Sequence, residues 1–294
     1  MAASVIGVIG GSGLYDLPGL VDATWTRVDS PWGTPSDELL IGTIGGNKLV
    51  FLPRHGRGHR IPPSEIDYRA NIDALKRAGV TDLVSISAVG SYREDLAPGT
   101  FVLIDQFVDR TVARASSFFG TGCVGHVGFG HPVSPGLMDR LKVAALAEDI
   151  DVRRGGTYVC MEGPQFSTLA ESLWYKSAGF DVIGMTNMPE AKLAREAELP
   201  YATVAMVTDY DCWHPSEDHV DVASVIKVVY DNADKARRLI ARFAHDFPAE
   251  HPPCPIGSDR ALDHALMTAH DKRDPALLAK LDAVAGRVLN KVRP

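Results

Sequence analysis

Short apolar runs rich in valine and isoleucine alternate along the chain with segments of helical period. Runs of this kind are typical of strands that are buried on both faces of a sheet. They predict strands at Val5–Ile9, Leu49–Leu52, Leu83–Ile86, Phe101–Ile104, Val182–Ile183 and Thr203–Val207. Such strands need a layer of helices on each side, so the intervening segments decide the architecture.

The segments between these strands carry apolar residues at helical spacing and recognisable helix ends. Thr168 and Glu171 have the spacing of a capping box, and Gly79 stands where a helix is expected to stop. The predicted helices are Tyr68–Ala78, Leu137–Glu148, a helix that opens at Thr168 and ends before Gly179, one between Pro189 and Pro200, and one from Val222 to Phe243. This alternation predicts an α/β protein: a single three-layer α/β/α domain with a central mixed, largely parallel sheet.

The end of the chain departs from this alternation. The stretch Pro248–Pro255 is rich in Pro and His and has the composition of a linker. Beyond it, Ala261–His270 and Pro275–Val292 predict helices that are too few to form a core of their own. We therefore expect one main domain over residues 1–247. We expect residues 248–294 to be a linker and a helical tail, packed on that domain or on a neighbouring subunit.

Composition and charge exclude several classes of protein. The chain has 294 residues, of which 45% are hydrophobic and 23% charged, so it is globular rather than disordered. Its net charge of −7 argues against a nucleic-acid partner, and no apolar run is long enough to cross a membrane. The first residues lack the basic region of a signal peptide, and the four cysteines form no CxxC pair. We expect a cytoplasmic protein with reduced thiols and no bound metal.

A glycine-rich loop follows the first predicted strand, over Ile9–Leu14. Its glycines allow backbone N–H groups to converge on an anion, and the Ser12 hydroxyl is a further donor. The dinucleotide-binding fingerprint fails because Asp16 stands where a small residue is required, and no GK[ST] follows as in a Walker loop. A nucleophile elbow centred on Ser12 fails because Leu14 replaces the required glycine. The loop by itself fits an anion-binding site and a tight structural turn equally well.

A second loop, Pro53–Arg60, places five cationic or potentially cationic side chains and two glycines after the strand Leu49–Leu52. A guanidinium group offers a planar pair of donors that matches phosphate oxygens. His55 and His59 have the helical spacing of metal ligands, but the glycines between them oppose a helix. By itself the loop also fits a solvated surface turn. Together with the glycine-rich loop, it predicts a phosphate site.

Two carboxylates, Asp209 and Asp211, stand at the carboxyl end of the predicted strand Thr203–Val207, where ligands of α/β sheets bind. If the strand continues, both side chains lie on one face, with Cα atoms about 6.5–7 Å apart. In a dry pocket such a pair retains one proton, so it can donate to one ligand atom and accept from another. Adenine presents that combination at N7 and its amino group, whereas a 6-oxopurine presents two acceptors. An Asx-type turn is the structural alternative.

Residues of three further segments have both a structural and a functional interpretation. Phe166 can stack on a base or belong to the core. Thr186 precedes a predicted helix, where it can bind an anion together with the first N–H groups or serve only as an N-cap. The segment Ala113–Pro135 has no period, and a loop of that length in a compact domain is usually functional or lies at an interface. Its His126 and His131 are candidate interface or substrate contacts.

Eight segments, taken together and in this order, carry a resemblance to a known family. They read GVIGGSGLYD, PWGTPSD, PRHGRGH, DYRANIDALK, IDQFVDRT, EGPQFST, GMTNMPEAKLA and TDYDCWHPSED, and the resemblance covers about Val5 to Phe243. The chain resembles the trimeric purine nucleoside phosphorylase family, and within it the members that act on methylthioadenosine. The resemblance implies a nucleoside phosphorylase-like fold and a homotrimer with shared active sites. It also implies phosphorolysis without a cofactor, with inorganic phosphate as co-substrate and no nucleic-acid or membrane partner.

The resemblance also implies a role for each residue at a matching motif position. The implied phosphate ligands are Ser12, Arg54, His55, Ser87 and Thr186. The implied substrate contacts are Met185 under the ribose, Phe166 stacked on the base, Ser167, Asp209 and Asp211 on the purine, His126 lent by a neighbouring subunit to the methylthio group, and Val222, Val225 and Ile226 in its apolar pocket. Asp209 is the expected catalytic residue, because a protonated carboxyl there can give the departing purine its proton at N7.

Three alternatives remain open at this point. The first is a phosphorylase for 6-oxopurines such as inosine or methylthioinosine, against which the aspartate pair argues. The second is a purine nucleoside binding protein without catalysis. The third is a hydrolase, in which water replaces phosphate as the nucleophile.

Overall fold

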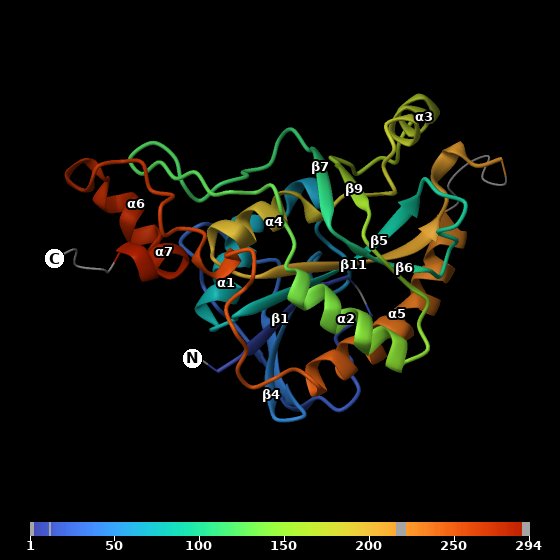
Figure 1. The fold of residues 1–294 in the computed structure, drawn as a ribbon, viewed down its shortest axis with the longest axis horizontal. Helices are drawn as coiled ribbons and strands as arrows, with labels where there is room; N and C mark the ends of the chain where they lie inside the picture. The colour runs from blue at the N-terminus through green and yellow to red at the C-terminus, as the bar shows by residue number, and fades with distance from the viewer. Residues whose placement is uncertain (1–2, 12, 216–221, 290–294) are drawn as a thin grey trace.

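Figure 1 shows the chain as a computed structural model, which describes residues 3–11, 13–215 and 222–289. Within these ranges eleven strands form one sheet. They are β1 (Val5–Gly10), β2 (Val21–Thr26), β3 (Leu39–Ile44), β4 (Asn47–Pro53), β5 (Asp82–Ser91), β6 (Phe101–Ile104), β7 (Gln106–Arg110), β8 (Val152–Arg154), β9 (Thr157–Met161), β10 (Val182–Gly184) and β11 (Tyr201–Asp209).

The sheet is mixed, with parallel strands at its centre. From one edge the order is β2-β3-β4-β1-β5-β10-β9-β7, and β11, β6 and β8 branch from β5. β1 pairs in parallel with β4 and with β5, and β5 pairs in parallel with β11. β10 runs antiparallel to β5, and β6 antiparallel to β11. The carboxyl ends of β4, β1, β5 and β11 therefore meet at one edge, where ligands bind in sheets of this type.

Helices cover both faces of this sheet (Figure 1). In the described ranges they are α1 (Tyr68–Arg77), α2 (Pro135–Ala147), α3 (Leu169–Ser177), α4 (Asn187–Glu196), α5 (Val222–His245), α6 (Pro275–Lys280) and α7 (Asp282–Leu289). Along β1, Val8 packs into one apolar cluster with Leu239 of α5, while its neighbour Ile9 packs into a second cluster with Ile72 of α1. The sheet is thus buried on both faces, which confirms the predicted three-layer α/β/α architecture.

All six predicted strands are present, and the missed ones lie toward the edges. β2 is largely exposed, and β7 carries polar residues. Strands in such positions do not need two apolar faces, so they lack the continuous apolar runs on which the prediction depended. The predicted capping box of α3 is confirmed, since Thr168 and Glu171 bond each other's backbone N–H groups.

The helix predicted over Ala261–His270 is wrong. This segment forms turns that pair with the irregular loop before α2: Ala265 O accepts from His126 N at 2.9 Å, and Met267 N donates to Val124 O at 2.9 Å. Leu262 and Ala265 of this segment are buried, whereas Met267 is exposed. Tertiary contacts therefore satisfy the backbone groups that a helix would have satisfied internally.

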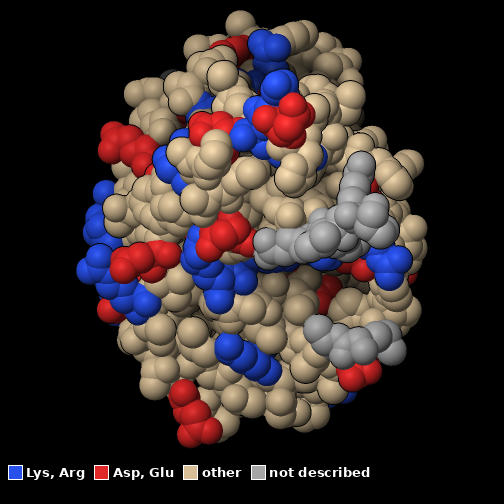
Figure 2. All heavy atoms as spheres, turned by 90° about the vertical axis from the view of Figure 1, so that its left-hand side faces the viewer, with Lys and Arg blue, Asp and Glu red and all other residues tan. Residues whose placement is uncertain are grey.

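The last described residues pack against the main body. Val284 of α7 is buried in the same apolar cluster as α1. Ion pairs join Asp282 to Arg77, and Arg287 to Glu198. Figure 2 shows acidic and basic side chains interspersed over the face on this side of the molecule. The tail is thus attached by apolar burial and by local pairing of opposite charges.

Candidate active site

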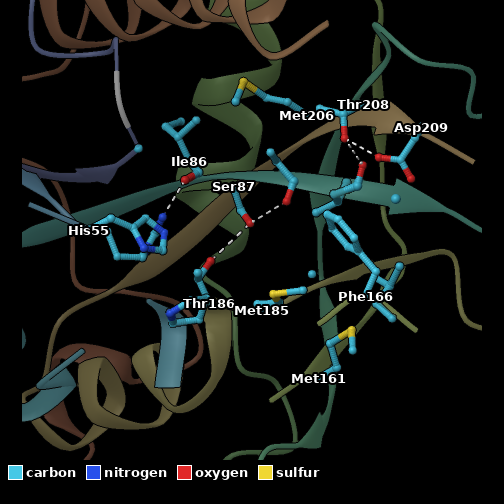
Figure 3. Close-up of a pocket in the computed structure, with 18 of the residues that line it drawn as sticks. His55, Ile86, Ser87, Met161, Phe166, Met185, Thr186, Met206, Thr208 and Asp209 are labelled. Atoms are coloured by element: carbon cyan, nitrogen blue, oxygen red, sulfur yellow. Dashed lines mark hydrogen bonds between the residues drawn. The ribbon is translucent and has the colours of Figure 1, made fainter. Parts of the chain in front are cut away.

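A cavity of about 310 Å³ opens beside the carboxyl-terminal parts of β5, β10 and β11 (Figure 3). Gly11 of the glycine-rich loop lines it as well. Of the predicted site residues, it gathers Arg54, His55, Ser87, Phe166, Ser167, Met185, Thr186, Asp209 and Asp211. Segments far apart in sequence thus border one space, and this space is the candidate active site.

Three hydroxyl groups form a cluster at one end of the cavity. Ser87 Oγ lies 3.3 Å from Thr186 Oγ1 and 3.2 Å from Tyr158 Oη. Burial raises the pKa of Tyr158, so its phenol stays protonated. An ideal Cβ on Gly184 would lie 1.9 Å from Tyr158 Oη, so the phenol reaches this position only because residue 184 is glycine. Hydroxyl groups in this arrangement can turn their protons toward an oxyanion.

The start of α4 differs from the predicted anion site at a helix N-terminus. Thr186 is the N-cap residue, but its side chain makes no capping bond. The backbone of Met188 is not helical, with φ −119° and ψ 132°, so the regular helix begins only after it. The Thr186 hydroxyl turns to Ser87 instead, and the anion-binding capacity here comes from side chains more than from a helix end.

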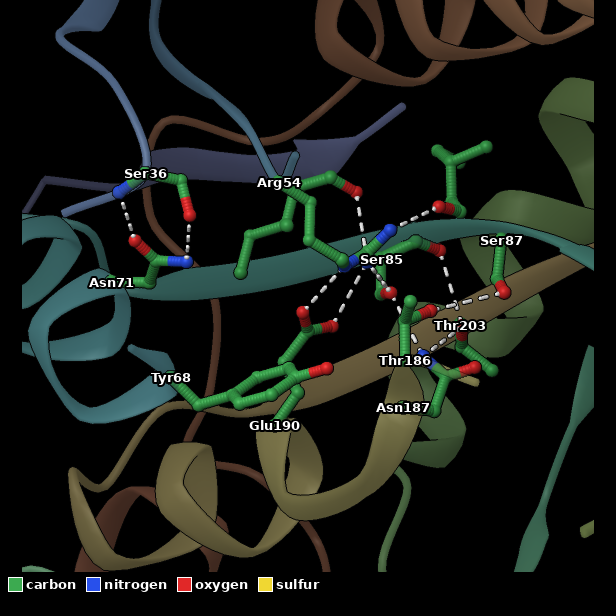
Figure 4. Close-up of polar contacts among 12 residues, drawn as sticks. Ser36, Arg54, Tyr68, Asn71, Ser85, Ser87, Thr186, Asn187, Glu190 and Thr203 are labelled. Carbon is green, nitrogen blue, oxygen red and sulfur yellow. Dashed lines mark hydrogen bonds and ion pairs between the residues drawn. The ribbon is translucent and has the colours of Figure 1, made fainter. Parts of the chain in front are cut away.

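Arg54 lines the cavity, and its guanidinium forms a buried ion pair with Glu190 (Figure 4). Each of the two side chains is 2% exposed, and their Nε–Oε2 distance is 2.8 Å. Further bonds from the guanidinium reach Ser85 Oγ at 2.6 Å and Ile86 O at 2.9 Å. Burial lowers the pKa of Arg54, but the charge of Glu190 outweighs this and raises it overall. The guanidinium is therefore fixed and charged, and Glu190 balances its charge.

His55 presents a neutral ring to the cavity. Its Nδ1 lies 2.9 Å from the Ile61 carbonyl oxygen, and a carbonyl only accepts, so Nδ1 carries the proton. Burial, and next the charge of Arg54, lower the pKa of His55 to about 4. At neutral pH Nε2 is thus an acceptor. It can receive a bond from a protonated phosphate oxygen, or donate one after the ring gains a second proton.

The two aspartates lie together at the other end of the cavity, although the strand does not continue between them. β11 ends at Asp209, and Asp211 begins the short 3₁₀ helix Asp211–Trp213 with a left-handed φ of 53°. The Asp211 backbone N donates to Asp209 Oδ1 at 2.8 Å. This is the Asx-type turn weighed from the sequence, and it coexists with the functional interpretation because both carboxylates line the cavity. Both are buried.

The wall between these two ends is mostly apolar. Phe166 is 49% exposed and belongs to the lining, not to the core. Met185 lies near it, between Thr186 and Phe166 in Figure 3. The cavity thus offers hydroxyl groups at one end, carboxyls at the other, and apolar contacts between them, which suits a nucleoside and an anion.

Some of the predicted residues are not gathered by this cavity. His126 is exposed and lines a separate hollow, with Lys192 and Glu196. Ser12 lies outside the described residues. The side chains of Val222, Val225 and Ile226 at the start of α5 also lie outside the described part of the structure.

Sequence reasoning missed the residues that support the site. Glu190 and Tyr158 were not selected, although Glu190 is a lone acidic residue in an otherwise buried strand-to-helix junction. The available signal was a charged residue, Glu190, within the otherwise uncharged stretch Val182–Ala191. Tyr158 gave none, because an aromatic residue in an apolar run is usually core.

Metal and membrane chemistry find no support in the described part of the chain. No group of three or more His, Cys, Asp or Glu side chains in it could hold a metal ion. None of its helices combines the length and hydropathy that a bilayer crossing requires.

Comparison with known proteins links this site to nucleoside chemistry. A family model described as the phosphorylase superfamily matches residues 5–245. The chain is 68% identical over 289 residues to S-methyl-5′-thioadenosine phosphorylase of Bradyrhizobium diazoefficiens, covering 98% of this chain and 99% of that protein. It is 45% identical to a crystal structure of methylthioadenosine phosphorylase from an Antarctic soil metagenomic library, with a TM-score of 0.90 and coverage of 97% and 99%. The Schistosoma mansoni enzyme in complex with tubercidin is 37% identical, with a TM-score of 0.77 and coverage of 84% and 93%.

Proposed function

The chain belongs to the phosphorylase superfamily, and from that premise we propose that it catalyses the phosphorolysis of S-methyl-5′-thioadenosine. Phosphate displaces adenine, and the products are adenine and 5-methylthioribose 1-phosphate, so the enzyme serves purine and methionine salvage. One observation carries the proposal: a single cavity has a hydroxyl cluster above a buried guanidinium at one end and a buried aspartate pair at the other.

At the phosphate end, the cavity residues hold the nucleophile. Ser87 and Thr186 donate to phosphate oxygens, Arg54 supplies positive charge from below, and His55 bonds a further oxygen. Ser12 completes this set by its motif position. As the bond from the ribose C1′ to N9 breaks, the sugar gains positive charge, and an anion held beneath it both stabilises that charge and forms the new C–O bond.

At the purine end, the aspartate pair provides the proton that the leaving group needs. A protonated Asp209 donates to N7 of the departing adenine, and the pair accepts a bond from its 6-amino group. Phe166 stacks on the base, Ser167 contacts it, and Met185 lies under the ribose. A 6-oxopurine would place a second acceptor opposite a carboxylate, which disfavours it.

The site for the 5′-methylthio group of the substrate is the third part of the proposal, and it involves a second chain. Val222, Val225 and Ile226 form an apolar pocket for the methylthio group, and His126 of a neighbouring chain covers it in a homotrimer. The exposure of His126, in a hollow separate from the cavity, supports this arrangement. Light scattering coupled to size exclusion tests the trimer, and a monomer with full activity would contradict it.

The remaining parts of the proposal concern organisation. Residues 1–247 form the catalytic domain, and residues 248–294 form the linker and the helical tail. The match of the family model to residues 5–245 supports this division. The enzyme uses inorganic phosphate as co-substrate, needs no cofactor, and acts in the cytoplasm on small molecules.

Adenine release with and without phosphate tests the reaction itself. We expect release from methylthioadenosine only when phosphate is present, with 5-methylthioribose 1-phosphate as the second product. Full release in phosphate-free buffer would identify a hydrolase, and none in either buffer would identify a binding protein. Equal or better turnover of inosine would overturn the purine assignment.

A further inference from the structure

Asp211 is held by two hydroxyl donors that its sequence motif does not contain. Tyr92 Oη donates to Asp211 Oδ2 at 3.0 Å, and Ser172 Oγ donates to the same oxygen at 2.7 Å. Tyr92 follows β5 and Ser172 lies in α3, so two separate elements converge on one carboxylate oxygen. All three side chains are buried. Both hydroxyls thus donate to one oxygen of Asp211, which accepts from each of them.

The surroundings of Asp209 are different. Its Oδ2 lies 2.7 Å from Thr208 Oγ1, and that hydroxyl also lies 3.1 Å from Val89 O. A hydroxyl has one proton, so Thr208 can donate to Asp209, or donate to Val89 and accept from a protonated Asp209. Asp209 Oδ1 accepts from Asp211 N at 2.8 Å, so a proton on Asp209 belongs on Oδ2, which can then donate to Thr208. A proton on Asp211 Oδ2 would instead oppose two donors.

We propose that Tyr92 and Ser172 are positioning residues that hold Asp211 as the carboxylate of the pair and thereby keep the shared proton on Asp209. The pair then offers one donor and one acceptor in a fixed order. This order fits N7 and the 6-amino group of adenine, so the two hydroxyls contribute to selection of 6-aminopurines over 6-oxopurines. The inference rests on the proposed function, because it assigns the acid and the acceptor of that reaction.

The charges around Asp211 agree with this assignment. Asp209, Tyr92 and Cys212 are titratable groups that interact with Asp211 in the described part of the chain. Burial, and next the negative charge of Asp211, raise the pKa of Tyr92, so its hydroxyl remains a donor. The same two causes raise the pKa of the Cys212 thiol, which stays neutral. None of these three groups carries a positive charge that could pair with Asp211 in place of the two hydroxyls.

The pH profile of kcat/KM for methylthioadenosine tests the assignment. Tyr92→Phe removes one donor from the Asp211 carboxylate, so its protonation becomes easier. We expect the acidic limb of the profile to move up by about one pH unit, so that kcat/KM falls about tenfold at pH values below that limb. Tyr175→Phe is the matched control. It removes a hydroxyl from a buried ring 6.3 Å from that of Tyr92, and that hydroxyl does not donate to Asp211.

Ser172 gives an independent second variant. Ser172→Ala should shift the acidic limb in the same direction as Tyr92→Phe, and Ser172→Thr, which keeps the hydroxyl, should restore it. Thermal melts show which variants are folded. The inference is overturned if the folded Tyr92→Phe and Ser172→Ala proteins have the same acidic limb as Tyr175→Phe.

Calorimetric binding of adenine and of hypoxanthine separates this inference from the proposed function. In Tyr92→Phe the preference for adenine should fall about tenfold, because a second proton on the pair suits the two acceptors of hypoxanthine. This measurement needs no turnover. A wild-type protein that binds adenine but releases none from methylthioadenosine would refute the function alone. An unchanged preference in Tyr92→Phe would refute the role of Tyr92 alone.

Discussion

Arg54 and Glu190 form an almost fully buried ion pair, and the pairing of individual side chains such as these decides what the cavity can bind. The guanidinium is charged, yet it is already balanced before phosphate arrives. In the proposed function, phosphate would therefore meet fixed dipoles and hydroxyls more than an excess of positive charge. A fixed, desolvated donor set costs no rearrangement during the reaction, which is the condition under which electrostatic stabilisation of a transition state is largest.

Glu190→Gln tests how much this ion pair contributes to the stability of the fold. Removing one partner leaves the other charge buried and uncompensated, so the free energy of unfolding should fall by about 3–5 kcal/mol. Urea unfolding at fixed protein concentration measures it. Asp29→Asn is the control, because it breaks the exposed pair with Arg27 and should change stability little. Equal losses of unfolding free energy in the two variants would show that the buried pair stabilises the fold no more than the exposed pair does.

Asp209→Asn tests the proton donor. An amide cannot release a proton to N7, so kcat/KM for methylthioadenosine should fall about 10²–10⁴-fold. The amide NH₂ still donates, so the ratio of 6-oxopurine to 6-aminopurine turnover should rise. Steady-state kinetics on both substrates measure this. Asp139→Asn, on an exposed acid of α2, should change neither value. An unchanged substrate ratio in Asp209→Asn would contradict its role as donor to N7.

Elements contribute to the site through the close packing that their small residues allow. β9 and β10 pair in parallel, and Gly184 lies opposite Cys160 in this register. The missing side chain at residue 184 leaves room for the Tyr158 phenol, which then reaches Ser87 on β5. The pairing of two short strands thus fixes a hydroxyl beside Ser87, at the end of the cavity that we propose binds phosphate.

Gly184→Ala should disturb that end selectively. The new methyl group would overlap Tyr158 Oη, so the phenol must move and lose its bond to Ser87. We expect the KM for phosphate to rise about fivefold or more, from the loss of about one hydrogen bond, with a smaller change in the KM for the nucleoside. Gly136→Ala in α2 is the control, since its Cβ would meet no atom closer than 4.0 Å. A larger effect on the nucleoside than on phosphate would contradict this picture.

At the scale of the whole molecule, burial couples stability to pH. Glu196 is buried beside the irregular loop, where Ser117 Oγ donates to Oε1 at 2.7 Å and Phe118 N to Oε2 at 2.7 Å. Burial outweighs these bonds and raises the pKa of Glu196 to about 7. Its ordinary value is 4.5, so between about pH 4.5 and 7 the folded protein holds a proton that the unfolded chain releases. The free energy of unfolding therefore falls as pH rises through this range.

Glu196→Gln should remove this dependence. The contribution of Glu196 amounts to about 3 kcal/mol across the range, from about 1.4 kcal/mol for each unit of pKa shift. Urea unfolding of the wild type and the variant at pH 5, 6 and 7 measures it, and the difference between the two proteins should grow with pH in favour of the variant. Glu65→Gln, at an exposed position, should show no such trend. A constant difference between Glu196→Gln and the wild type would contradict the raised pKa.

The sequence by itself determined the layers of the fold and which polar or charged segments follow the ends of strands. A continuous apolar run indicates a strand that is buried on both faces, inside a sheet covered by helices. The strands at Val5–Ile9 and Thr203–Val207 could therefore be predicted from their apolar runs alone. The basic loop and the Asp209–Asp211 pair could be identified because charged groups are costly to bury without a partner. The glycine-rich loop could be identified because its glycines allow backbone N–H groups to converge on an anion. The resemblance to a family rested on these same segments.

Only the tertiary structure decided how these residues are paired. Whether Arg54 is solvated or buried against Glu190 depends on a partner 136 residues away, and no local pattern encodes such a distance. The donors to Asp211 likewise come from two other elements, and the segment 261–270 forms turns because the irregular loop satisfies its backbone. Periodicity reports which face of an element is apolar, whereas hydrogen-bond partners and proton positions are set by contacts that exist only after the elements have packed.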